Sequence, residues 1–259
     1  MDDGGRPVAD GDAGLLLTQQ DLIPTPPEHQ EERLRFFCAD RTPLGVARQG
    51  AKHAISRYLR IAARAAKRPV ILDCSAGEGG ILVVLEGVSP RAHRTAVGPR
   101  PGGEEPLRRH AQEVISGSFI DHDGKARSDV PQAHIIIGNP PFADGAKNPL
   151  WMPFWAACHE KLLPGGVQSM LGLNEIGQRG RRDHMAFTVC PPTEQAHIAG
   201  PIKFRGVRRG ADLRCYSWWL RRHGEVWNPD PLDVHWRTAH LPWLPKEDRE
   251  WRQIPGTEP

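Results

Sequence analysis

Short apolar runs alternate with longer amphipathic or polar stretches through the middle of the chain. Residues 44–67 are rich in Ala and Arg, and they place Ile55, Leu59 and Ala62-Ala63 on one face of a helix. Apolar runs of strand length follow, separated by helical or loop segments: Val70–Cys74, Arg94–Gly98, Glu113–Phe119, His134–Gly138 and Val167–Leu173. This alternation predicts an α/β fold with a doubly wound, mostly parallel sheet and right-handed crossovers.

Two later runs, Gln195–Ala199 and Cys215–Leu220, are joined by a basic loop that contains glycine, and they predict a hairpin. Residues 1–34 are rich in Asp, Gly, Pro and Gln, which predicts a disordered or loosely attached segment. We therefore expect one domain over residues 35–224. Residues 225–259 form a Pro- and Trp-rich extension that the pattern does not place.

Composition excludes several classes of protein. A chain of 259 residues with 39% hydrophobic content can form one domain with a sizeable core. No apolar run approaches membrane-spanning length, and the acidic, Gly-rich N-terminus lacks the features of a signal peptide. The five cysteines form no C-x-x-C pair, so we expect neither a zinc site nor a disulfide framework, and no metal. A net charge of +3 does not by itself indicate nucleic acid.

The run Val70-Ile-Leu-Asp-Cys-Ser-Ala-Gly-Glu-Gly-Gly80 predicts a buried strand, an acidic residue and a glycine turn before a helix. Gly77 and Gly79 allow a tight turn and a close approach of the backbone to a ligand. The following helix points its N-terminus at that ligand. No Gly-Lys-Ser/Thr follows, so the turn is not a phosphate-binding P-loop.

The run Ile135-Ile-Ile-Gly-Asn-Pro-Pro-Phe-Ala143 predicts a buried strand that the two prolines end. The Asn139 side-chain oxygen and the Pro140 carbonyl can both accept hydrogen bonds from an amino group, while Phe142 stacks on the ring that carries it. The alternative is a core strand stopped by proline without any binding role. Because ligands bind at the carboxyl ends of parallel strands, the fold predicts that this loop lies beside the Gly77–Gly79 turn.

These two runs resemble motif I and motif IV of S-adenosylmethionine-dependent amino-methyltransferases, whose signature is [DN]PP[YFW]. Further segments resemble DNA adenine-N6 methyltransferases of phage or mobile-element type: residues 162–182, Gly200–Gly206 and Asp212–Trp219. The resemblance runs from about Phe36 to Gly224. It implies a class I (Rossmann-like) sheet of seven strands with an antiparallel last strand, and a cytoplasmic protein of a bacterial host or phage-infected cell.

The resemblance also implies the site residues. Asn139, Pro140, Pro141 and Phe142 would be catalytic and would hold a flipped adenine. S-adenosylmethionine would be the cofactor, bound by Asp73, Ser75, Ala76, Gly77, Gly79, Thr42, Pro43, Ser118, Phe119 and Asn139. Thr42-Pro43 has better spacing to Asp73 than Thr25-Pro26-Pro27 for the N-terminal cofactor motif.

Two acidic residues of the family pattern are missing. In the family the second strand ends in an acidic residue that binds the cofactor's ribose. Here that stretch reads Thr95-Ala-Val-Gly-Pro99, and Glu104 or Glu105 is the nearest substitute. The third strand carries Ser118 in place of the expected Asp, with Asp121 nearby. A catalytically decayed nucleic-acid-binding relic is therefore one alternative.

Arginines form three clusters, within residues 179–182, 205–214 and 221–222, and interleave with tryptophans that all lie after residue 150. With double-stranded DNA as the expected partner, the phosphate contacts would come from Arg179, Arg181, Arg182, Arg205, Arg208 and Arg209. A solvated charged surface is the alternative for these side chains. Methylation of guanine N2 in RNA or of a protein glutamine is the alternative for the substrate.

Overall fold

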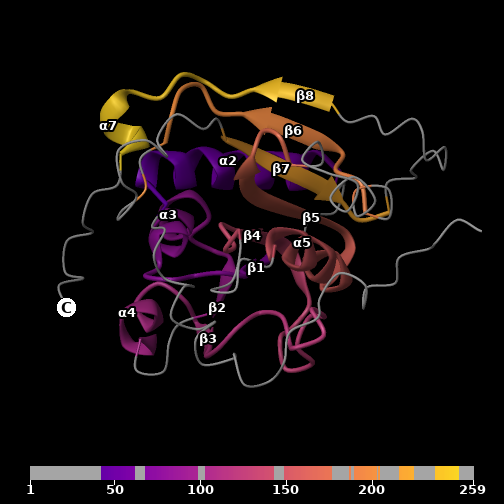
Figure 1. The fold of residues 1–259 in the computed structure, drawn as a ribbon. Coiled ribbons are helices and arrows are strands. Elements are labelled where there is room, and N and C mark those ends of the chain that lie inside the picture. The colour runs from indigo at the N-terminus through magenta and orange to yellow at the C-terminus, as the bar shows by residue number, and fades with distance from the viewer. Residues whose placement is uncertain are drawn as a thin grey trace, which may run out of the picture.

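The computed structural model describes residues 42–61, 68–98, 103–142, 149–176, 187, 190–202, 204, 216–224 and 237–250. Within these ranges the chain forms one sheet of eight strands in the order β3-β2-β1-β4-β5-β7-β6-β8 (Figure 1). The strands are β1 (Val70–Asp73), β2 (His93–Val97), β3 (Glu113–Ile115), β4 (Ala133–Gly138), β5 (Leu162–Leu173), β6 (Glu194–His197), β7 (Tyr216–Arg222) and β8 (Arg237–His240). The helices are α2 (Leu44–Ile61), α3 (Gly80–Val88), α4 (Glu104–Arg108), α5 (Trp151–Glu160) and α7 (Lys246–Arg249).

The sheet is parallel except at β7, which runs antiparallel to both β5 and β6. From β1 the chain moves outward through β2 and β3, then returns to place β4 on the other side of β1. The strand order therefore reverses between β1 and β4, and ligands of doubly wound sheets bind at such a point. The predicted α/β class, parallel sheet and antiparallel hairpin strand are confirmed.

The structure differs from the predicted strands at three main places. The fifth strand begins at Leu162 rather than at Val167. The third strand ends at Ile115 rather than at Phe119, because Gly117 turns into the left-handed region with φ of 96°. The sheet also has one strand more than the seven expected. β8 and α7 come from the Pro- and Trp-rich extension, and β8 pairs in parallel with β6. The described part of that extension thus continues the sheet.

Helices α2 and α5 cover opposite faces of the sheet, as the two tryptophans of β7 show. Successive side chains of a strand point to opposite faces. Trp218 lies against Gly50 of α2, whereas the Trp219 ring lies 5.3 Å from that of Phe187, which also contacts Trp155 of α5. Both tryptophans are fully buried, so both belong to the core.

An ion-pair network fixes α2 to the hairpin. The buried carboxylate of Glu194 on β6 accepts hydrogen bonds from His53 Nε2 at 2.8 Å and Arg57 at 2.6 Å. Burial alone would raise the pKa of Glu194, but the hydrogen bonds and the charges of His53 and Arg57 together outweigh burial and lower the pKa to about 2. No helix in the described ranges has both the length and the apolar character needed to cross a membrane.

Candidate active site

The carboxyl ends of β1 and β4 lie directly side by side. Asp73 pairs with Ile137 in the register of the two strands, and the Cys74 amide donates to the Ile137 carbonyl at 3.1 Å. Gly138 is packed so closely that a Cβ there would lie 2.5 Å from Cys74 Sγ and 2.8 Å from Ser75 Oγ. The glycine turn after β1 and the Asn-Pro-Pro-Phe loop after β4 are therefore neighbours, as expected.

The turn after β1 needs glycine at two positions. Gly77 and Gly79 have φ values of 52° and 86°, a region that L side chains rarely adopt. The Gly79 amide donates to the Ala76 carbonyl at 2.7 Å, and the Ala76 amide donates to Val97 at the end of β2 at 2.8 Å. A Cβ on Gly79 would also lie 2.9 Å from a methyl group of Leu107. The turn is thus compact and tied to β2.

Asp73 ends β1 with a fully buried carboxyl group. Burial raises its pKa to about 7, although a hydrogen bond of 3.1 Å from the Ser75 amide to Oδ1 opposes the rise. Neither Asp73 Oδ2 nor Ser75 Oγ has a hydrogen-bond partner within the described ranges. The turn therefore contains two buried polar atoms, Asp73 Oδ2 and Ser75 Oγ, that form no hydrogen bond with each other.

The loop after β4 is held from both ends. Asn139 Nδ2 donates to Thr42 Oγ1 at 3.1 Å, and the Leu150 amide donates to the Phe142 carbonyl at 3.0 Å. Pro140 is buried, whereas Asn139, Pro141 and Phe142 each remain partly exposed. The loop therefore holds the Asn139 amide in one orientation and leaves the Phe142 side chain partly exposed.

A second aromatic side chain faces the loop from the hairpin. The Tyr216 ring at the start of β7 lies 6.2 Å from that of Phe142 and 5.1 Å from that of Phe204. Because β7 is antiparallel, its first residue lies at the carboxyl edge of the parallel strands. The sequence motif that contains Tyr216 predicts no role for it, and only the pairing of β7 with β5 brings it here.

The carboxyl ends of β2 and β3 carry no acidic residue. Gly98 follows β2 with φ of 113°, and its ideal Cβ position lies 3.6 Å from Ser75 Cα and 3.8 Å from the Gly117 carbonyl. The loops after β1, β2 and β3 therefore meet around glycines. Glu104 at the start of α4 lies near this edge, where its carboxylate accepts a hydrogen bond of 2.5 Å from Ser116.

The loop after β3 is fixed by Arg127, which donates to the carbonyls of Ser116 at 2.8 Å and Ser118 at 2.9 Å. The Ser118 hydroxyl accepts the Ile120 amide at 3.2 Å. Phe119 is fully buried and stacks on Phe154 of α5, so its ring packs in the core. The predicted cofactor contacts of Ser118 and Phe119 would then come from exposed or backbone atoms of this loop.

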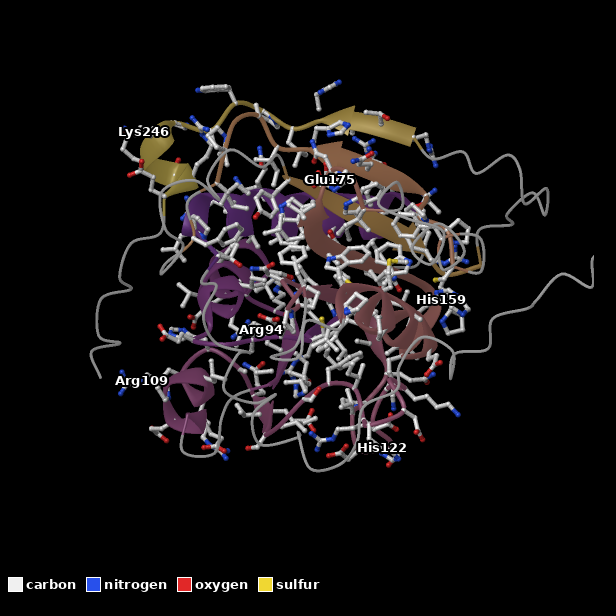
Figure 2. The ribbon with its side chains drawn as sticks, in the orientation of Figure 1. Arg94, Arg109, His122, His159, Glu175 and Lys246 are labelled. Carbon is white, nitrogen blue, oxygen red and sulfur yellow. The ribbon has the colours of Figure 1, made fainter. Side chains whose placement is uncertain are left out.

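A polar cluster lies further along the same edge, where β5 ends and β7 begins. The buried Ser217 hydroxyl donates to Asn174 Oδ1 at 2.6 Å and lies 3.0 Å from His197 Nδ1. Glu175, the next residue after Asn174, is labelled in Figure 2. The His197 ring stacks on His240 of β8 with centroids 5.5 Å apart. These groups extend the polar surface of the edge beyond Tyr216.

The six arginines expected to contact DNA lie outside the described residues, so their role stays a prediction. The tryptophans were expected to stack on bases. Four of them, on α5 and β7, are buried in the core and are not exposed for stacking: Trp151, Trp155, Trp218 and Trp219. Trp243 is the exception among the described tryptophans, with 67% of its surface exposed and the Arg249 guanidinium 4.8 Å from its ring centre.

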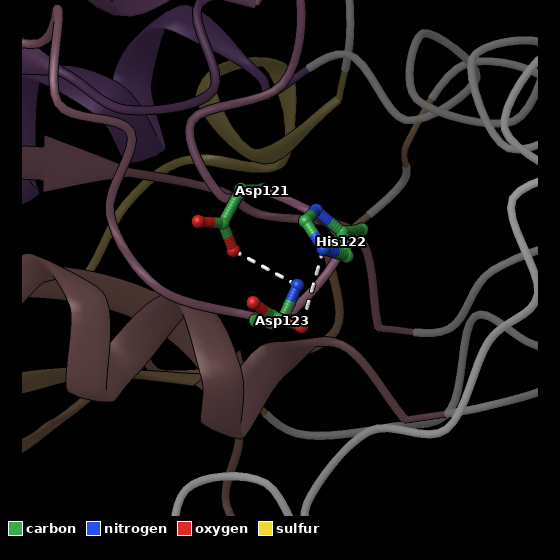
Figure 3. Close-up of side chains that lie close together, drawn as sticks. All are labelled: Asp121, His122 and Asp123. Atoms are coloured by element: carbon green, nitrogen blue, oxygen red, sulfur yellow. Dashed lines mark hydrogen bonds and ion pairs between the residues drawn. The ribbon is translucent and has the colours of Figure 1, made fainter.

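Three neighbouring side chains have ligand atoms close enough to share a cation: Asp121, His122 and Asp123 (Figure 3). Asp121 Oδ1 accepts the amides of Asp123 and Lys125, both at 2.9 Å, and so closes a turn. His122 Nε2 lies 3.3 Å from Asp123 Oδ1, and both side chains are exposed. Turn formation accounts for the position of Asp121 without a metal.

These features define a class I S-adenosylmethionine-dependent methyltransferase fold, with both motifs at the reversal of strand order. Comparison with protein-family models and with curated protein sequences gives no match. Solved structures do match, and the chain covers less than two thirds of the length of each of the three compared here.

The M protein of the type I restriction enzyme EcoKI is 18% identical with a TM-score of 0.53, over 74% of this chain and 45% of that one. A chain of a type I restriction-modification system is 13% identical with a TM-score of 0.54, over 86% and 50%. A putative class I methyltransferase from Listeria monocytogenes is 14% identical with a TM-score of 0.52, over 77% and 65%. At these identities the likeness concerns the fold.

Proposed function

We propose that this chain transfers a methyl group from S-adenosylmethionine to the N6 amino group of adenine in double-stranded DNA. The observation that carries the proposal is the contact between the two motifs at the reversal of strand order. Asp73 pairs with Ile137, and Gly138 packs on Cys74 and Ser75. A cofactor on the turn after β1 would therefore lie next to a base held by Asn139.

The residues at the turn fit the cofactor. Gly77 and Gly79 provide a left-handed turn without side chains, and Ser75 Oγ is a polar atom without a partner within the described ranges. Thr42 at the start of α2 lies within hydrogen-bond distance of Asn139. The acidic residue expected after β2 to bind the cofactor's ribose is missing. Glu104 is the next carboxylate along the chain, and we assign ribose binding to it. When bound, the cofactor supplies an electrophilic methyl group.

The chain's own residues would activate and orient the amine. The adenine amino nitrogen is a poor nucleophile because its lone pair is delocalised into the ring. Asn139 Oδ1 and the Pro140 carbonyl would accept hydrogen bonds from its two N–H groups and favour tetrahedral geometry at the nitrogen, which directs the lone pair at the methyl group. The nitrogen would form its bond to the methyl carbon as the bond from that carbon to the sulfonium sulfur breaks, leaving a neutral thioether, and the nitrogen would lose one proton to solvent. Positioning and preorganised acceptors supply the catalysis, so the step requires no covalent nucleophile.

The aromatic rings at the edge suit a flipped base. Adenine in a duplex has its amino group paired, so the base must leave the stack before transfer. Phe142 is partly exposed and would stack on the base, with Tyr216 at 6.2 Å forming a second wall of the same pocket. The energetic contribution expected of such a stacking ring is roughly 1–3 kcal/mol.

DNA as the acceptor is supported by the resemblance of the loop and hairpin sequences to adenine-N6 methyltransferases. The structural neighbours include the M protein of a type I restriction enzyme and a chain of a type I restriction-modification system, which supports DNA as the acceptor in this proposal. Arg179, Arg181 and Arg182, with Arg205, Arg208 and Arg209, would contact the backbone phosphates.

The test is incubation of the full chain with methyl-labelled S-adenosylmethionine and, separately, duplex DNA, RNA and a protein mixture. Nucleoside mass spectrometry then identifies the product. The proposal predicts label in DNA as N6-methyladenine. Label found in RNA as N2-methylguanine, or in a protein glutamine, would show that the acceptor is not DNA, although the transfer of a methyl group from S-adenosylmethionine would stand. No transfer to any acceptor, together with no cofactor binding by calorimetry, would overturn the proposed activity.

A further inference from the structure

Thr42 touches both halves of the site. Its hydroxyl oxygen accepts a hydrogen bond of 3.1 Å from Asn139 Nδ2. Its carbonyl oxygen lies 3.4 Å from the ideal Cβ position of Gly80, the first residue of α3 after the glycine turn. Thr42 also immediately precedes the first turn of α2, where the Ala47 amide donates to the Pro43 carbonyl at 2.9 Å. The backbone of Thr42 is therefore anchored while its side chain faces the Asn-Pro-Pro-Phe loop.

In the structure the hydrogen bond from Asn139 Nδ2 to Thr42 Oγ1 leaves the acceptor end of the amide for the target. An asparagine side chain has a donor end and an acceptor end of nearly the same shape. Holding Nδ2 at Thr42 turns Oδ1 away from Thr42. If the amide rotated by half a turn, its NH2 group would stand where Oδ1 stands, and it would oppose the donor hydrogens of an amino group.

We propose that Thr42 is a positioning residue that keeps the acceptor end of Asn139 toward the substrate amine. This role rests on the proposed function, and it adds to the expected contact of Thr42 with the cofactor. The Thr42 hydroxyl can accept this hydrogen bond from the amide, and the start of α2 two residues later holds its backbone in place. Valine has nearly the same shape and cannot accept.

The first test compares Thr42→Val with Thr42→Ser at saturating S-adenosylmethionine, using duplex DNA as the acceptor. The valine variant should lower kcat about tenfold, equivalent to ~1.4 kcal/mol. KM for DNA should change little, because stacking and phosphate contacts are kept. The serine variant retains the oxygen and should stay within about twofold of the wild type, the size of a weak hydrogen-bond perturbation.

The second test repeats the valine substitution in an Asn139→Asp background. A carboxylate has two acceptor oxygens and no donor end, so it cannot be presented in the wrong orientation. Thr42→Val should then reduce kcat by less than about twofold. A general structural role for Thr42 predicts the same loss in both backgrounds, and the cofactor affinity of each variant, measured by calorimetry, separates a lost cofactor contact from a lost orientation.

Equal kcat for Thr42→Val and the wild type would overturn the inference and leave the proposed function intact. An equal tenfold loss in the Asn139→Asp background would also overturn it. A wild type that binds the cofactor and methylates no acceptor would instead contradict the proposed function. If Thr42→Val does not fold, as judged by its circular dichroism melt, Thr42→Ala takes its place with the same expected outcomes.

Discussion

The substitution Gly138→Ala tests whether the contact between β1 and β4 sets the geometry of the site. Gly138 is the residue just before Asn139, and it is buried between the ends of the two strands. Its backbone has no positive φ, so alanine adds no backbone strain. The added methyl group would lie 2.5 Å from Cys74 Sγ and 2.8 Å from Ser75 Oγ. The two strand ends would therefore have to separate.

Overpacking of this kind costs about 1–3 kcal/mol. For a domain of this size each kcal/mol lowers Tm by about 2–4 °C, so we expect a fall of about 2–12 °C. The catalytic effect should be larger than the loss of stability implies. Relief of the overlap shifts Asn139 relative to the turn after β1 by up to ~1 Å, and a displacement of that size costs about 10²-fold in rate.

The assay combines a thermal melt with kcat for methyl transfer at saturating cofactor. Gly87→Ala is the matched control, because no atom lies within 4 Å of its ideal Cβ position, and in a helix it should gain about 0.5–1 kcal/mol. Adding Cys74→Ala removes the nearest atom and should restore part of the lost rate. A Gly138→Ala protein with unchanged Tm and kcat would refute the close apposition of the two motifs.

The other predictions concern the cofactor turn and two buried carboxyl groups. Gly79→Val should abolish cofactor binding while the chain still folds. Valine would have to adopt φ of 86°, and its Cβ would lie 2.9 Å from a methyl group of Leu107. Calorimetry with S-adenosylmethionine on the folded variant measures the loss. Burial raises the pKa of Asp73 to about 7, so the free protein should lose stability as pH rises from about 4 to 7, and Asp73→Asn should flatten that slope in denaturant titrations. Glu194 has the opposite sign: its pKa is lowered to about 2, so its contribution is present above about pH 4.5 and lost as pH falls toward 2, and Glu194→Gln should remove that acid limb.

The sequence predicts the fold well because the relevant signals are local. Apolar runs of strand length, glycines after Asp73 and the two prolines after Asn139 each fix the conformation of a few neighbouring residues. The order of the strands then places both motifs at one edge. The strand β8 was missed because its sequence, Arg237-Thr-Ala-His240, is mostly exposed and carries no apolar pattern.

The parts of the site that the sequence does not predict depend on pairing between distant segments. Tyr216 approaches Phe142 only because β7 pairs antiparallel with β5. The two tryptophans of β7 look like candidates for base stacking, yet helices cover both faces of that strand and bury both rings. Alternation along the strand predicts that one of the two rings lies in the core. The burial of both rings and the approach of Tyr216 to Phe142 do not follow from residue type or spacing along the chain.

The most direct measurement of the central claim is a paired comparison of Asn139→Ala with the wild type. Cofactor affinity is measured by calorimetry, and N6-methyladenine formed in duplex DNA is measured by mass spectrometry in a single turnover. In the proposed function the Asn139 oxygen contacts the target amine, and Asn139 is only one of ten residues expected at the cofactor. The variant should therefore keep most of its affinity for S-adenosylmethionine while transfer falls by about 10²–10³. Normal transfer by the Asn139→Ala protein would contradict the account.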